Sequence, residues 1–236
     1  MSIKKDKRFD KLHYDFSKMK LILFQQFEIL EELVQTGLNE MNPKTVNQFK
    51  KNEEKLDQFE LKMSDNIILA IGLEQPMARD LRLMVSYFRM ISHLERIGDQ
   101  LNNVMRFFHK MDPPCIPENQ KESVLNMLAI SEEMVRKALI SFEDGDHEYA
   151  IWTIKNDEIV DEMQFKLLKR MVKKNAPAEV EPTTIYNLLN FNSILGSIER
   201  IADNATNIAE ASIYYLQGID LRHQELPEED NKEPTK

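Results

Sequence analysis

The chain has 236 residues, a formal net charge of −9 and only six glycines, which favours a mostly helical protein with one substantial core or two small bundles. The acidic balance argues against nucleic acid as a main partner and suits the binding of cations. The single cysteine, Cys115, excludes an intrachain disulfide and a metal cage built from thiolates.

The N-terminal stretch MSIKKDKRFD lacks the apolar centre of a signal peptide. No apolar run in the chain approaches the roughly 18 residues needed to cross a membrane. We therefore expect the protein to be cytoplasmic.

Apolar residues from Phe9 to Leu38 recur at steps of three or four, which predicts one long amphipathic helix. A turn follows in NEMNPK, residues 39–44, where Asn42 can cap the next helix and Pro43 fits its first position.

The second predicted helix runs from Pro43 to a break at GLEQP, residues 72–76, and the third runs from Pro76 to Met111. The segment DPPCIP, residues 112–117, contains three prolines and is the clearest linker in the chain. We therefore expect residues 1–111 to form a first three-helix unit.

The same order of elements then starts again. Residues 118–144 predict a fourth helix, residues 146–175 a fifth and residues 183–218 a sixth. Together they give a second three-helix unit over residues 118–223. Residues 224–236 are acidic and polar and contain two prolines, which predicts a disordered tail.

An internal repeat relates the two units. HLERIGDQLNNV, residues 93–104, and SIERIADNATNI, residues 197–208, are identical at five of twelve positions. The same offset of 104 residues carries the apolar stripe of the second helix onto that of the fifth, with Thr153 as the one polar exception among six positions. We therefore expect an all-α fold of two tandem three-helix bundles, each running up, down and up.

Both copies of the repeated stretch carry two carboxylates four residues apart, Glu95 with Asp99 and Glu199 with Asp203. Residues at this spacing share one face of a helix. Each pair flanks the apolar stripe of its helix instead of lying within it.

The preceding helices carry matching pairs, which are Glu53 with Asp57 and Asp157 with Asp161. Antiparallel helices joined by a tight turn bring together residues whose numbers add up to a constant. Positions 57 and 95 add up to 152, as do 53 and 99; in the second unit both combinations add up to 360. Each unit should therefore gather four carboxylates at one level.

Two interpretations compete for these eight residues. A solvated acidic face, balanced by lysines and by Arg96 and Arg200, is the ordinary interpretation of any single pair. A metal site is favoured for the whole set, because four neighbouring negative charges repel one another and carboxylate oxygens suit Mg²⁺, Mn²⁺ and iron. Asn103 and Asn207 could each add an amide oxygen or simply cap the polar stripe.

None of the five histidines stands three residues after a glutamate, so the Glu-x-x-His pairs of ferritin-like di-iron bundles are missing. His93 has Ser197 at its place in the other unit and is interpreted as structural. Neither a Ser-His-Asp arrangement nor a phosphate-binding glycine loop can be identified.

The repeated stretches, together with QPMARDLRLM at 75–84 and YYLQGIDLRH at 214–223, resemble the PhoU family of phosphate-transport regulators. The resemblance covers residues 10–223 and therefore both units. The second unit departs from it at the turn, where Gln75-Pro76 and Asp80-Leu81-Arg82 have no counterpart.

The resemblance implies two three-helix bundles related by pseudo-twofold symmetry, often assembled as homodimers that bind metal ions. Iron, zinc, manganese and magnesium are the metals to consider. The implied metal ligands are Glu53, Asp57, Glu95, Asp99, Asp157, Asp161, Glu199 and Asp203.

The resemblance also implies a function without enzyme activity. A PhoU protein is cytoplasmic, meets the membrane only peripherally, and couples the ATPase subunit of the phosphate ABC transporter to a phosphate-sensing histidine kinase. It holds back phosphate uptake and the phosphate-starvation response, and so contributes to phosphate homeostasis. Two alternatives stay open: a di-metal enzyme that uses the same carboxylates, and a metal-free helical scaffold that binds partners through apolar grooves.

Overall fold

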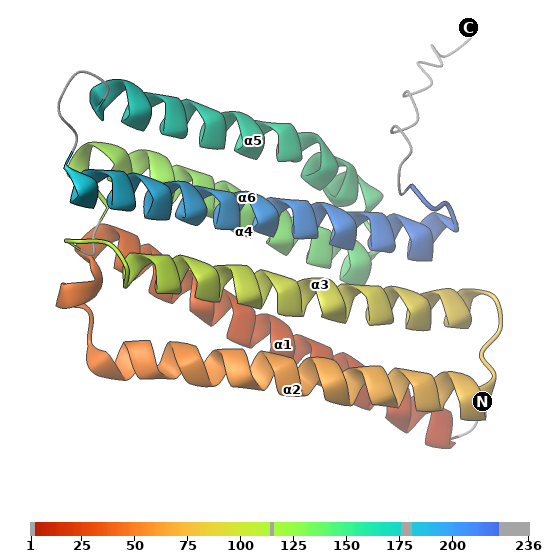
Figure 1. The fold of residues 1–236 in the computed structure, drawn as a ribbon. Coiled ribbons are helices and arrows are strands. Elements are labelled where there is room, and N and C mark those ends of the chain that lie inside the picture. Colours follow the sequence, from red (N-terminus) through yellow and green to blue (C-terminus); the bar gives the residue numbers. More distant parts are fainter. Residues whose placement is uncertain (1–2, 114–115, 176–180, 222–236) are drawn as a thin grey trace, which may run out of the picture.

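A computed structural model describes residues 3–113, 116–175 and 181–221 (Figure 1). The described residues form helices and contain no strand, which confirms the predicted all-α fold. The elements are α1 (Ile3–Thr36), a short 3₁₀ helix η1 (Leu38–Glu40), α2 (Pro43–Glu74), α3 (Arg79–Phe108), α4 (Glu118–Asp144), α5 (His147–Asn175) and α6 (Pro182–Gln217).

Most helix ends lie close to the predicted ones, but α1 ends at Thr36, so that Leu38 lies in η1, and α3 ends at Phe108 and not at Met111. Asn42 caps α2 by accepting a hydrogen bond from the backbone of Lys44, as predicted, and Pro43 is its first residue. Pro76, however, belongs to a turn and not to α3. Gln75 and Ala78, on either side of this proline, both have a φ of 45°, so the chain cannot enter α3 before Arg79.

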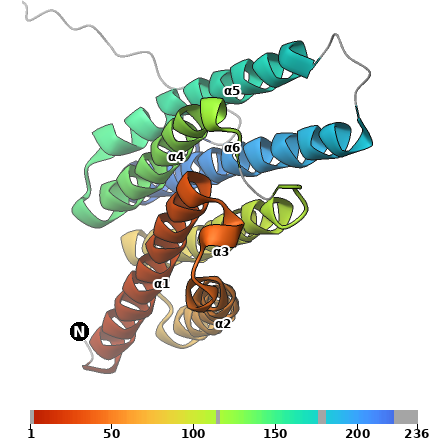
Figure 2. The same ribbon diagram turned by 90° about the vertical axis from the view of Figure 1, so that its left-hand side faces the viewer.

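Four helices lie side by side in one layer, in the order α2, α3, α6, α5, and α1 and α4 lie behind this layer (Figure 1, Figure 2). α3 and α6 form the most extensive helix–helix contact in the described residues. They run antiparallel, because Arg79 at the start of α3 contacts Tyr215 near the end of α6, while Asn187 near the start of α6 exchanges hydrogen bonds with Asp112 just after α3. The contact joins the two three-helix units.

A cluster of aromatic rings also joins the two units. Tyr87 of α3 packs edge-on against Phe16 of α1, with 5.0 Å between ring centroids, and against Phe142 of α4, at 4.9 Å. Tyr215 of α6 lies 5.3 Å from Phe142. Such edge-to-face pairs add stabilisation beyond the area they bury. One continuous apolar core therefore runs through both units.

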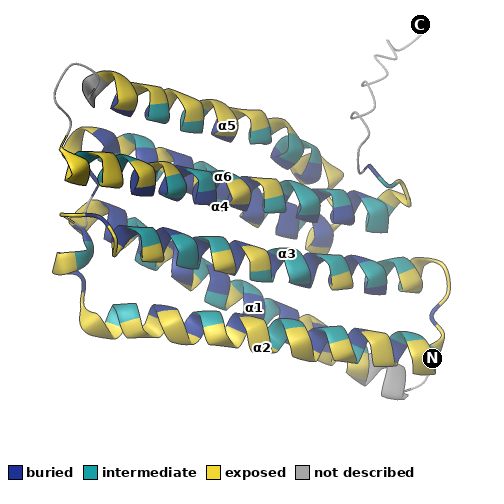
Figure 3. Ribbon diagram, viewed as in Figure 1, coloured by how far each residue is buried: buried dark blue, intermediate teal, exposed yellow. Residues whose placement is uncertain are grey.

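The outer helices of the layer, α2 and α5, are the most exposed along their length (Figure 3). Each keeps only a narrow buried stripe, which in α2 consists of residues such as Leu56, Met63 and Ile67. The predicted linker at residues 112–117 lies between α3 and α4 and is described only in part. The predicted tail at residues 224–236 lies outside the described residues.

Candidate functional site

In the first unit, the α2–α3 hairpin brings three of the four predicted carboxylates together. Oxygens of Asp57, Glu95 and Asp99 all lie within 4.8 Å of one another. Asp57 and Asp99 are exposed and Glu95 is half-buried. Among the described residues of the chain, these three alone form a carboxylate group this tight.

Glu53, the fourth predicted residue, lies half-buried at the edge of this group. The Asn102 side-chain amide donates a hydrogen bond to Glu53 Oε1. Asn102 was not predicted, although it stands three residues after Asp99 and seven after Glu95, a spacing that places it on the same face of α3. Asn103, the predicted candidate, instead donates to Gln100 within its own helix.

Burial and mutual repulsion disfavour the charged form of these acids. Burial, followed by the charges of Asp99 and Asp57, raises the pKa of Glu95 to about 7. Burial, followed by Asp57, also raises the pKa of Asp99. The same two causes, with Asp57 and Asp99 as the main neighbours, raise the pKa of Glu53. The four side chains therefore act on one another as a single group.

The second unit repeats this electrostatic pattern between α5 and α6. Burial, followed by Asp203 and Asp161, raises the pKa of Glu199 to about 7. Burial and the same two neighbours raise the pKa of Asp157 to about 6. Burial and Asp161 raise the pKa of Asp203. The hairpin relation thus brings the four carboxylates of this unit close enough to interact, although more loosely than in the first unit.

One oxygen of Asp157 has an incomplete hydrogen-bond environment. Its Oδ1 atom is buried without a hydrogen-bond partner. The neighbouring Thr206 hydroxyl only partly opposes the rise of its pKa. The Thr206 hydroxyl is itself buried without a partner, so it satisfies this oxygen only weakly, and a proton or a cation would satisfy it more fully. The oxygen-rich donor set around Asp157 therefore fits a hard or borderline cation.

Gly98, within the repeated motif, lets α2 and α3 approach each other beside the first cluster. A Cβ atom at this position would lie 2.6 Å from Leu56 Cδ1, closer than real contacts allow. Leu56 is fully buried and immediately precedes Asp57. The second unit has a buried alanine, Ala202, at the equivalent position.

Two other polar residues of the motifs make hydrogen bonds within the fold. His93 hydrogen-bonds to Asn204 at 2.9 Å across the α3–α6 contact, in keeping with its interpretation as structural. Asn207 donates to the backbone of Asp203, one turn back in α6. It thus caps the polar stripe, the second of the two roles considered for it.

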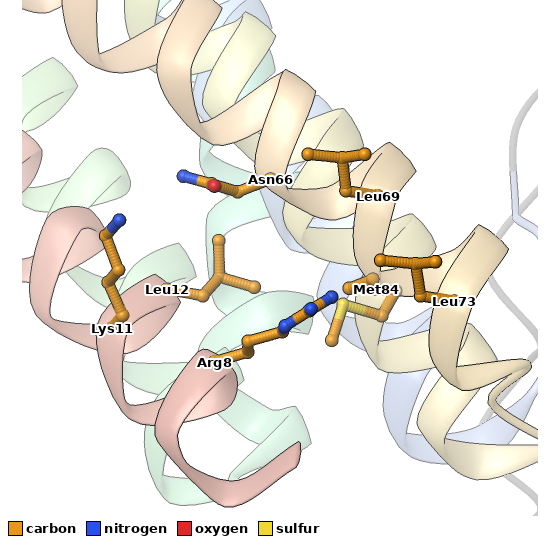
Figure 4. A pocket seen from close by; sticks show the side chains of 8 residues that line it. Arg8, Lys11, Leu12, Asn66, Leu69, Leu73 and Met84 are labelled. Carbon is orange, nitrogen blue, oxygen red and sulfur yellow. The ribbon is translucent and has the colours of Figure 1, made fainter. Parts of the chain in front are cut away.

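A cavity of about 260 Å³ lies apart from both clusters, between the start of α1, the second half of α2 and α3 (Figure 4). Arg8 and Lys11 of α1 face Asn66 of α2 across it, and apolar side chains such as Leu73 and Met84 complete the wall. None of the eight predicted metal ligands lines this cavity. No described helix is long and apolar enough to cross a membrane.

Comparison with known proteins extends over most of the chain. The sequence model of the PhoU domain family matches residues 27–108 and 124–212. A Pseudomonas aeruginosa protein named phosphate-specific transport system accessory protein PhoU homolog is 30% identical over 176 residues, which cover 75% of this chain and 72% of the relative. An Aquifex aeolicus protein of the same name is 28% identical and covers 92% of this chain and 98% of the relative.

Two solved structures share the fold. The crystal structure of PhoU from Pseudomonas aeruginosa superposes with a TM-score of 0.77 at 24% identity, covering 91% of this chain and 99% of that one. The phosphate transport system regulatory protein PhoU from Streptococcus pneumoniae gives a TM-score of 0.76 at 22% identity, with coverage of 92% and 98%.

Proposed function

This chain belongs to the PhoU family, and from that premise we propose that it is an accessory protein of a phosphate transport system that restrains phosphate uptake and phosphate-starvation signalling. The names of relatives that match both units support the accessory role in phosphate transport. The direction of that role, a restraint on uptake and signalling, follows from the family resemblance.

The observation that carries the mechanism is the doubled carboxylate cluster. In each unit, half-buried acids with raised pKa values face one another across a helix hairpin, and a bound cation would offset their repulsion. The ion would hold the two helices of the hairpin together and set the shape of the face around it. We propose iron, zinc, manganese or magnesium as the metal and the eight predicted carboxylates as its ligands.

We propose that the metal-loaded protein is an adaptor between the ATPase subunit of the phosphate ABC transporter and a phosphate-sensing histidine kinase. It would work as a homodimer in the cytoplasm, where it meets the membrane only through these partners. The names of the relatives support the link to the transport system. The kinase, the homodimer and the location rest on the family resemblance.

Metal content is the first test. Elemental mass spectrometry of protein purified without chelator should find at least one ion per three-helix unit. Changing one carboxylate in each cluster, as Asp99→Asn with Asp203→Asn, should remove the ions. The matched control is Glu54→Gln with Glu158→Gln, which changes two exposed acids that are also repeat-equivalent but lie outside the predicted ligand set. A wild-type protein that binds no metal on titration would contradict the metal site.

The regulatory role is tested in a strain that lacks the gene and carries a reporter for phosphate-starvation genes. The wild-type chain should restore repression at high phosphate, and the Asp99→Asn, Asp203→Asn variant should restore it only weakly. Full repression by a variant that has lost its metal would overturn the proposed link between metal and regulation. Failure of the deletion to raise reporter activity would overturn the regulatory role itself.

We also propose that the clusters have no enzymatic role. They lack the Glu-x-x-His pairs of di-iron oxidases, and Asp57 and Asp99 are exposed to solvent. Addition of Fe²⁺ to the metal-free protein should therefore cause no more oxygen consumption than it causes with the Asp99→Asn, Asp203→Asn variant.

A further inference from the structure

Exposed apolar side chains continue the line of the first carboxylate cluster along α2. Leu61 and Ile68 follow Asp57 by four and eleven residues, a helical spacing that places all three on one face. The two side chains are 65% and 58% exposed. They are therefore separate from the buried stripe that holds α2 against the rest of its unit.

The facing helix carries a matching line. Phe88 and Leu81 precede Glu95 in α3 by seven and fourteen residues and are also exposed. The hairpin relation places them across from the apolar residues of α2. We call these four residues the first apolar patch: Leu61, Ile68, Leu81 and Phe88.

The second unit exposes apolar residues at the same repeat positions. Phe165, Val172 and Ile185 stand 104 residues after Leu61, Ile68 and Leu81. Phe165 is 64% exposed and Val172 54% exposed. With Leu189, one turn along α6 from Ile185, they form the second apolar patch: Phe165, Val172, Ile185 and Leu189.

Isolated exposed apolar residues are ordinary. Here, however, three repeat-equivalent positions stay apolar and exposed in both units, although core packing does not require them. Leu61 and Phe165 differ in shape, as do Ile68 and Val172, so the shared property is the apolar surface itself. Contiguous exposed apolar surface beside polar groups is typical of a protein-binding site.

Both patches lie on the same side of the four-helix layer. This follows because α1 packs behind α2 and α3, and α4 packs behind α5 and α6, so exposed residues between the helices of each hairpin face the opposite side (Figure 1, Figure 2). The α2–α3 turn lies at one end of the layer, and the end of α5 and the start of α6 lie at the other, so the patches also lie toward opposite ends (Figure 1). Because the repeat relates α3 to α6 and these helices run antiparallel, an approximate twofold axis passes between them.

Charge adds a second requirement for whatever binds this face. Each patch borders a cluster of four carboxylates, and one divalent ion per cluster would still leave a net negative charge. A complementary surface therefore combines apolar side chains with basic ones. The two patches differ in one neighbouring charge. Lys169 lies over the Phe165 ring in the second patch, whereas Asp65 stands at the equivalent position of α2 beside the first patch. The two contacts thus share an apolar centre and an acidic inner border.

We propose that this face binds one homodimeric protein, each subunit of which packs an apolar surface with basic neighbours onto one patch and its adjoining carboxylates. A homodimer presents two identical surfaces related by its own twofold axis. If that axis coincides with the approximate twofold axis of this chain, each subunit of the homodimer can contact one patch. The inference rests on the proposed function for the choice of partner, the ATPase subunit of the phosphate transporter, because the relatives are named for the transport system and ABC ATPases act in pairs.

The test measures binding of the purified ATPase dimer by calorimetry and by mass photometry. Variants are Leu61→Ser with Ile68→Ser, Phe165→Ser with Val172→Ser, and the combination of all four. The matched control is Tyr14→Ser with Leu21→Ser, two residues on α1 that are also seven apart and are 60% and 52% exposed. Melting temperature and metal content, measured for every variant, show that the fold and the carboxylate clusters are intact.

We expect one chain to bind two ATPase subunits. Each two-residue patch variant should weaken binding at least tenfold, the four-residue variant at least a hundredfold, and the control less than twofold. A patch variant that binds like the control, or one chain bound per ATPase subunit, overturns the proposal. The proposal is also overturned if the patch variants bind the ATPase normally and lose only self-association or only binding to anionic lipid vesicles.

Failure of the wild-type chain to bind the ATPase dimer also overturns this inference. It leaves the accessory role to be judged separately by the reporter strain, so the two failures are distinguishable.

Discussion

At the scale of single residues, the two half-buried glutamates of the repeated motif determine how the clusters respond to pH. Glu95 and Glu199 occupy equivalent positions, and burial raises the pKa of each to about 7, with the nearest aspartates as the next cause. At neutral pH without metal, both are therefore held in an environment that disfavours their charge. A bound cation would reverse this preference, because it favours the deprotonated form.

The stability of the metal-free protein should therefore fall as pH rises from about 4.5, the ordinary pKa of a glutamate, to about 7. In this window the folded state holds more protons than the unfolded state, so the free energy of unfolding decreases with pH. Denaturant unfolding in chelator checks this. The Glu95→Gln, Glu199→Gln variant should show a flatter pH profile and greater stability than wild type at pH 8. Parallel profiles for the two proteins would contradict the assignment.

At the scale of helices, the α2–α3 hairpin depends on one close approach. Leu56 occupies the space where a Cβ atom at Gly98 would lie, and this contact directly adjoins Asp57 and Asp99. The identity of the residue between Ile97 and Asp99 therefore affects both the packing of the hairpin and the spacing of its carboxylates.

Gly98→Ala should destabilise the protein by about 0.5–2 kcal/mol, because overpacking a filled site costs about 1–3 kcal/mol and the helix propensity of alanine offsets about 0.5–1 kcal/mol of this. Gly72→Ala is the matched control. Gly72 is also helical, but nothing lies within 4 Å of its added Cβ, so the higher helix propensity of alanine should stabilise by about 0.5–1 kcal/mol. Denaturant unfolding measures both. If both substitutions change the free energy of unfolding by the same amount, the contact between Leu56 and residue 98 does not limit how closely α2 and α3 pack.

At the scale of the whole molecule, the two units share one core but carry separate clusters. The α3–α6 contact and the aromatic group around Phe142 hold the units together, whereas the carboxylates of each hairpin interact only within their own unit. Metal binding at one cluster should therefore add its stabilisation largely independently of the other.

A metal that binds only the folded protein stabilises it by about 2.7 kcal/mol per site at a hundred times its Kd. The melting temperature should thus rise when the metal-free protein is titrated with the metal that it binds, and fall again when chelator is added. Asp99→Asn alone and Asp203→Asn alone should each remove about half of the shift, since distant sites contribute additively. A melting temperature that changes with neither metal nor chelator would favour the alternative of a helical scaffold that binds no metal.

The sequence by itself determined the helices, the repeat and the membership of the clusters. Helical period, caps and turn length are local properties, and a short turn between two antiparallel helices leaves only a narrow range of registers. That narrow range is why Asp57 could be paired with Glu95 before the fold was known. The sequence predicted the break at residues 72–76, but not the positive φ of Gln75 and Ala78 that delays the start of α3 to Arg79, because the apolar pattern does not record backbone φ.

The tertiary structure alone decided how side chains meet across elements that are distant in the chain. It turned Glu53 toward Asn102, left Asp157 Oδ1 without a donor, and set Phe142 between Tyr87 and Tyr215. It also ordered the front layer as α2, α3, α6 and α5 with α1 and α4 behind it, so the exposed sides of both hairpins face the same way. These features depend on rotamers and on packing between the two units, which periodicity within one helix does not specify.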